Sequence, residues 1–301
     1  MTAQYTAESI VEENKGATTW GLARLYTGLT YLICQAAVLV IVVIAPYARQ
    51  AASILETSTF VSLSLAAAFL AVENARSFQR GQTARRAWTF IAVMPMADAL
   101  AYAAYTWGDF LGTQAKSTLL IGVGTALLSI TRIGAAMAFL NIVRVYRRSG
   151  LPLLLRTRDY LGMAAVTALE VVALVFSSSG ARESGGVELQ KLVLILAIPL
   201  VIALAPCSVL GVIIWRYTSG MGGGLVAKAW RCNLAYGAAW LAYIALNAVV
   251  AYYLPASQTA SPLTLPYILF NGVDWVLKGS VFLIFLGASY QYEACRTAPK
   301  I

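Results

Sequence analysis

The sequence contains no histidine and few charged residues. Among its 301 positions, Asp, Glu, Lys and Arg together account for only 12%. Without imidazole groups, histidine-based acid–base catalysis is excluded. The four cysteines show no paired spacing, so a zinc or haem site has almost no ligands to draw on. We therefore expect no metal site and no enzymatic activity.

The chain is instead rich in long apolar stretches. Hydrophobic residues make up 59% of it, whereas charged residues fall far below the rough quarter of an ordinary soluble domain. About 20 apolar residues suffice for a helix to cross the hydrocarbon core of a bilayer. The sequence therefore predicts an all-α, multi-pass integral membrane protein with eight transmembrane helices, at 27–46, 54–73, 88–107, 117–141, 160–177, 191–215, 233–254 and 265–289.

The basic residues indicate an orientation for these helices. If the amino terminus is cytoplasmic, sixteen of the 22 Lys and Arg residues fall on the cytoplasmic side and only four in the outer connections. Short positively charged loops stay in the cytoplasm. Both termini are therefore predicted to be cytoplasmic. Because topology explains the net charge of +9, no nucleic-acid partner is needed, and we expect contact with anionic lipid headgroups instead.

Five ionisable side chains fall well within the eight stretches: Asp98, Arg132, Glu170, Asp274 and Lys278. A lone charge at the bilayer centre costs about 3 kcal/mol on insertion scales, so each residue is a functional candidate. Lys278 lies too deep for its stem to reach a membrane surface.

Asp274 precedes Lys278 by four positions on the same helical face, and two interpretations of this pair stay open. The two side chains form a structural ion pair, or the amine condenses with a carbonyl ligand. In the second case a Schiff base forms, and Asp274 serves as the counterion that keeps it protonated.

This last stretch resembles the final helix of the microbial rhodopsins, in which an Asp is followed four residues later by the retinal-binding Lys. The preceding stretch adds Trp240 and Tyr243, at the spacing with which that family lines its retinal pocket. The resemblance implies retinal bound to Lys278, all-trans in the dark. Asn247 stands at a further pocket position that is aromatic in the family.

A second match begins at Arg85-Arg86-Ala87-Trp88 and continues through Pro95 and Tyr102, and it resembles the second helix of the rhodopsin bundle. It implies that Pro95 and Tyr102 line the retinal pocket. Asp98, one turn after Pro95, then falls beside the retinal lysine. It is either a second counterion or a hydrogen-bonded polar residue of the bundle interior.

The alignment implies a domain organisation. One extra transmembrane helix (27–46) follows a cytoplasmic segment (1–26), and a seven-helix retinal-binding bundle (54–290) precedes a cytoplasmic tail (291–301). The same resemblance implies an interhelical pair between Arg132 and Glu170. The stretch at 117–141 contains no Asp or Glu, which disfavours an ordinary proton pump and leaves Asp98 as the only further acid expected within reach of Lys278.

The resulting hypothesis is a photosensor that regulates a partner protein or channel. A light-gated ion channel is the first alternative. From a different class, a retinal-free membrane transporter or scaffold would use Asp274 and Lys278 as a buried ion pair. Expected partners are retinal, membrane lipids and an effector protein or channel. A homo-oligomer is expected by analogy alone.

Overall fold

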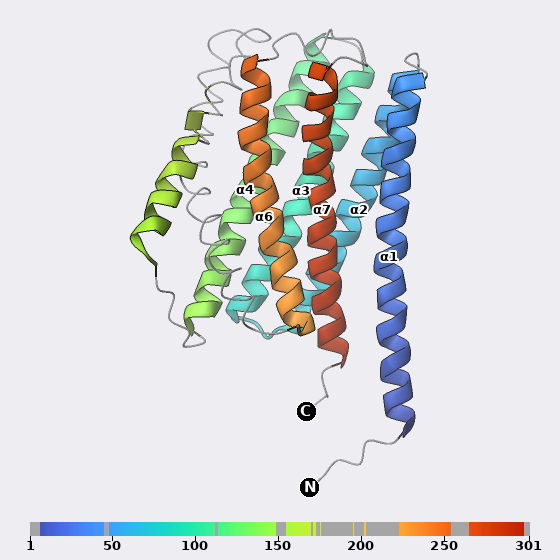
Figure 1. Ribbon diagram of the computed structural model, residues 1–301, viewed down its shortest axis with the longest axis vertical. Coiled ribbons are helices and arrows are strands. Elements are labelled where there is room, and N and C mark those ends of the chain that lie inside the picture. The colour runs from blue at the N-terminus through green and yellow to red at the C-terminus, as the bar shows by residue number, and fades with distance from the viewer. Residues whose placement is uncertain are drawn as a thin grey trace.

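The computed structural model describes residues 7–44, 48–111, 114–148, 155–169, 171–172, 175, 195, 202, 223–253 and 265–297. This part of the chain is helical apart from short connections and contains no strand. The labelled helices are α1 (Ala7–Ile44), α2 (Arg49–Ser77), α3 (Thr83–Leu111), α4 (Gln114–Arg148), α6 (Leu225–Tyr253) and α7 (Leu265–Thr297). They run roughly parallel to one long axis, and α1 begins at the same end of the molecule at which α7 ends (Figure 1).

Four of the described helices are long and apolar enough to cross a membrane. Their candidate spans are Thr19–Val42, Gln50–Ser77, Thr83–Trp107 and Ala126–Val145. These spans overlap the first four predicted stretches and support a multi-pass membrane protein by their length and composition.

The later predicted stretches are described in part. Helices α6 and α7 overlap the stretches at 233–254 and 265–289. Residues 157–169 are helical at the start of the stretch at 160–177, whereas most of the stretch at 191–215 lies outside the described residues.

Helix α1 differs from the prediction in its length. It begins at Ala7, inside the segment expected to precede the first transmembrane helix, because the polar residues there continue the helix without a break. The helix packs against α2 and α7 and lies at the edge of the molecule (Figure 1). It carries many exposed apolar side chains, among them Leu25, Leu32 and Ile44, as expected of a surface that faces lipid.

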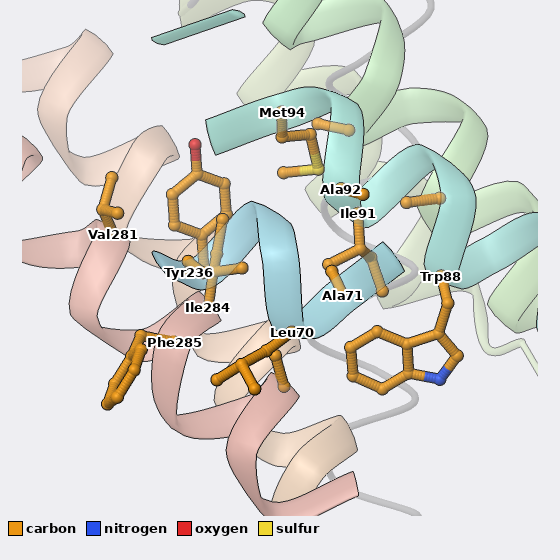
Figure 2. Close-up of a cluster of buried hydrophobic side chains, with 14 of the residues drawn as sticks. Leu70, Ala71, Trp88, Ile91, Ala92, Met94, Tyr236, Val281, Ile284 and Phe285 are labelled. Atoms are coloured by element: carbon orange, nitrogen blue, oxygen red, sulfur yellow. The ribbon is translucent and has the colours of Figure 1, made fainter. Parts of the chain in front are cut away.

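The core lies where α2, α3 and α7 meet, and α4 and α6 also contribute to it. Ala67, Ala71 and Ala75 recur every four residues on α2 and are all buried, so this face of the helix approaches its neighbours closely. Figure 2 shows Ala71 together with larger side chains of the same cluster from α3 and α7, including Trp88, Ile91 and Ile284.

Gly237 of α6 lies against the side chain of Phe139 on α4. A Cβ atom at this position would stand 2.2 Å from the ring of Phe139 on α4. No real Cβ contact is that short, so a larger residue at this position would require the Phe139 ring to move. Next to Gly237 in the chain is Tyr236, whose ring lies in the core (Figure 2).

Candidate functional site at Lys278

Lys278 lies on α7 and points its amine into the bundle. The residue is 6% exposed, and Nζ donates a hydrogen bond of 2.7 Å to Oε1 of Glu56 on α2. The two side chains are only 8% and 14% exposed. A buried charge is tolerated when a partner compensates it, and here the partner is 222 positions away in the chain.

Aromatic rings stand beside this ion pair. The centroid of the Tyr102 ring on α3 lies 5.1 Å from Nζ of Lys278, within the range of a cation–π interaction. Phe60, one turn after Glu56 on α2, packs edge-on against Tyr102 with 4.7 Å between the ring centroids. Tyr105 continues the row at 6.2 Å from Tyr102. In the described part of the chain, the amine therefore lies next to the Glu56 carboxylate and a row of aromatic rings.

Asp98 takes part in a second polar group at the centre of the bundle. It is 1% exposed, and its two carboxyl oxygens accept hydrogen bonds from different helices. The Thr131 hydroxyl of α4 donates to Oδ1 at 2.8 Å, and the Tyr236 hydroxyl of α6 donates to Oδ2 at 3.2 Å. Asp98 follows Pro95, which lies inside α3. The carboxyl thus joins α3, α4 and α6, as expected for a hydrogen-bonded residue of the interior.

The structure brings together part of the predicted site. Lys278 and Tyr102 are neighbours in space, and Asp98 lies one helical turn after Pro95 on α3. The predicted counterion and three pocket residues fall on α6 and α7, and their side chains lie outside the described part: Trp240, Tyr243, Asn247 and Asp274. For the predicted interhelical pair, Glu170 and the side chain of Arg132 also lie outside it.

Glu56 is the site residue that sequence reasoning missed. The expectation that Asp98 was the only further acid within reach of Lys278 is wrong, because Oε1 of Glu56 stands 2.7 Å from Nζ. Glu56 is the third residue of the stretch predicted at 54–73. A carboxylate so close to the end of a span is expected at the membrane surface. Helix α2 begins at Arg49 instead, so Glu56 lies in its second turn. The sequence did offer one signal for Glu56, because this acidic residue lies inside a predicted transmembrane stretch.

This arrangement has a definite chemical capacity. A buried lysine amine is the group that condenses with an aldehyde, and a carboxylate at hydrogen-bond distance can hold or accept its proton. Together, the Lys278 amine, the Glu56 carboxylate and the aromatic rings beside them fit a retinal linkage at Lys278. It also fits a permanent ion pair.

Comparison with known proteins adds no relative. No family model, curated protein or solved structure matches the chain. Its function therefore has to be argued from the chemistry at Lys278.

Proposed function

We propose that this protein is a retinal-binding photoreceptor in which Lys278 carries the chromophore as a Schiff base. The observation that carries the proposal is the buried amine of Lys278, held 2.7 Å from a carboxylate and flanked by an aromatic wall. Retinal would supply a double bond that isomerises on absorbing light. The protein acts as a photosensor or as a regulator of a partner protein or channel.

The proposed topology has eight transmembrane helices with both termini in the cytoplasm. Two observations support it. Helix α1 begins at the end of the molecule at which α7 ends (Figure 1), and the Lys and Arg residues favour the cytoplasm for that end. In this arrangement α1 is the extra helix, and the helices from α2 to α7 belong to the seven-helix bundle.

Glu56 is the proposed primary counterion. The contact between Nζ and Oε1 places its negative charge where a protonated Schiff base at Lys278 would need it. Asp274 keeps its predicted role on the same helical face as Lys278. Asp98 is better suited to stabilise the bundle, because its oxygens already accept hydrogen bonds from Thr131 and Tyr236.

Glu56 also has a role in forming the linkage. Only the neutral amine is a nucleophile, so the proton of the Lys278 ammonium must move first, and Oε1 of Glu56 lies in position to accept it. Retinal would supply the aldehyde for this condensation, and the Lys278 nitrogen would hold the bound chromophore, with the carbonyl oxygen lost as water. Glu56 can return its proton to the nitrogen and remain beside it as the carboxylate.

Reconstitution with all-trans retinal tests this proposal. We expect the purified chain to develop a visible absorption band that Lys278→Ala abolishes. The absence of a band at every pH would overturn the proposal. A robust photocurrent from this chain alone, in a patched cell, would favour the light-gated channel over the sensor.

The direct contact of Lys278 with Glu56 favours one alternative from another class. In a retinal-free transporter or scaffold, the two side chains would form a permanent ion pair or part of a substrate site. This function predicts that hydroxylamine and added retinal leave the protein spectrally unchanged. The photoreceptor predicts that hydroxylamine releases the chromophore and bleaches the band.

A further inference from the structure

Helices α2 and α3 enclose a groove outside the Lys278 site. A cavity of about 260 Å³ lies between the last turns of α2 and the first half of α3. Its lining includes Val72, Arg76, Arg85, Thr89, Val93 and Met96. Nothing in the proposed photochemistry uses this groove.

The charged and the apolar residues of the groove lie at different positions along the helix axis. Arg76 stands in the last turn of α2 and Arg85 in the first turn of α3, so both guanidinium groups lie at the same end. Met96 is eleven residues further along α3, about 16 Å at 1.5 Å per residue. Val72, Val93 and Met96 make the deeper part apolar. The groove thus has a cationic mouth and an apolar floor.

The short connection between the helices fixes this mouth. Gly81 adopts a φ of 90°, a conformation that glycine reaches without strain, and the chain reverses there between α2 and α3. Arg85 donates a hydrogen bond of 3.3 Å to the carbonyl oxygen of Phe78 in the connection. Arg76 is held by Glu73 at 2.7 Å, but its side chain remains 70% exposed. Both guanidinium groups therefore stay near the entrance.

Charge at this end favours an anionic ligand. Arg76, Arg80, Arg85 and Arg86 follow one another between positions 70 and 90, where Glu73 is the single acid. Arg148 of α4 adds another guanidinium, because it donates a hydrogen bond of 2.7 Å to the Thr83 hydroxyl at the start of α3. Guanidinium groups recognise phosphate well because they offer several N–H donors in one plane.

The position of the groove selects the class of ligand. It lies along the candidate spans Gln50–Ser77 and Thr83–Trp107, and its mouth is at the point where both meet the connection. A ligand with a phosphate at the mouth and an alkyl chain along the helices has the shape of a membrane lipid. We propose that the groove binds one anionic phospholipid, with its phosphate between Arg76 and Arg85 and one acyl chain along Val72, Val93 and Met96.

Native mass spectrometry of the purified full-length chain tests this site by titration with phosphatidylglycerol or phosphatidylcholine. We expect phosphatidylglycerol to bind preferentially, and the double substitution Arg76→Gln and Arg85→Gln to weaken it by at least about tenfold. The matched control is Arg80→Gln with Arg86→Gln. It removes the same charge from exposed residues that do not line the groove, and it should leave phosphatidylglycerol binding nearly unchanged.

A steric variant keeps the test valid if the arginine substitutions harm folding. Thr89 is exposed and lines the groove, so Thr89→Trp should narrow it and weaken phosphatidylglycerol binding without changing the charge. Equal losses in the two double substitutions would overturn the proposal in favour of general electrostatic attraction. So would competition by inorganic phosphate as strong as that by the lipid, or unchanged binding in Thr89→Trp.

Discussion

Two buried ion pairs connect α7 to different helices, and they differ in what surrounds the cation. At one end, Arg24 of α1 binds Glu293, and the two side chains are 11% and 6% exposed. Its Nε donates to the Ser289 hydroxyl at 2.8 Å, Nη2 donates to the Ser289 carbonyl, and the guanidinium lies 3.9 Å from the Tyr290 ring centroid. Deeper in the bundle, Lys278 binds Glu56 beside aromatic rings.

Under the proposed function, the difference separates a structural pair from a reactive one. A guanidinium keeps its charge under all ordinary conditions, and the planar group of Arg24 is held by an acid, a hydroxyl, a carbonyl and a ring. It can anchor α1 but cannot take part in proton transfer or condensation. A lysine amine can lose its proton and form a covalent bond. Similar burial and similar pairing are therefore compatible with opposite roles.

The largest effect should come from exchanging the two cations. Lys278→Arg keeps a positive charge that can still pair with Glu56, but a guanidinium does not form a Schiff base with an aldehyde. We expect complete loss of the visible band after reconstitution, while the elution profile and helical content remain those of the unsubstituted chain. Arg24→Lys should keep the band. A band in Lys278→Arg would show that retinal is attached elsewhere or not at all.

Breaking the Arg24–Glu293 pair should lower the free energy of unfolding instead of changing the absorption band. Arg24→Ala leaves the Glu293 carboxylate buried without its cation, and removing one partner of a buried pair costs about 3–5 kcal/mol. Denaturant unfolding in micelles would measure this loss. The matched control is Arg76→Ala: the Arg76 side chain is 70% exposed in its pair with Glu73, so the expected cost is about 0–1 kcal/mol. Equal costs would contradict the assignment of Arg24 as an anchor.

The third effect is a shift in colour at the reactive pair. Glu56→Gln should move the absorption maximum to longer wavelength, because less negative charge then stabilises the ground-state cation. Absorption spectra of the reconstituted variants at one fixed pH measure this shift. If Asp274→Asn or Asp98→Asn shifts the maximum and Glu56→Gln does not, the counterion is one of those acids.

The sequence predicted the helical character of the chain and the four candidate membrane spans, but the partners within the site only in part. Apolar length locates α2, α3 and α4 because a span must be continuous in sequence, and burial of Lys278 follows from its depth in such a span. Its contact with Glu56 joins residues 222 positions apart, and only the parallel packing of α2 and α7 brings them together. The helical periodicity of one stretch could suggest Asp274 as a partner of Lys278. It carries no information about Glu56, which lies on another helix.

The same reasoning explains Asp98. Its burial in the bundle could be predicted from its place in an apolar stretch, and the structure confirms it. Thr131 was visible as a polar residue of the next stretch, but Tyr236 belongs to a helix that begins more than a hundred residues later in the chain. Which hydroxyl meets which oxygen depends on how the helices rotate about their axes. Contacts such as that of Gly237 with the Phe139 ring accompany this packing, and no sequence pattern displays them.

The smallest effect concerns this acid, which accepts hydrogen bonds from two hydroxyl groups. Thr131→Val removes the donor at 2.8 Å from Oδ1, and a hydrogen bond to a charged group contributes about 1.5–3 kcal/mol. Tyr236→Phe removes a longer bond of 3.2 Å and should cost less. Denaturant unfolding measures both, with Thr89→Val as the control, since Thr89 is exposed and its hydroxyl donates to the Arg85 carbonyl oxygen of its own helix. A Thr131→Val protein as stable as the control would show that the carboxyl of Asp98 does not depend on this hydroxyl. Asp98 would then again be a candidate for the charge that faces Lys278.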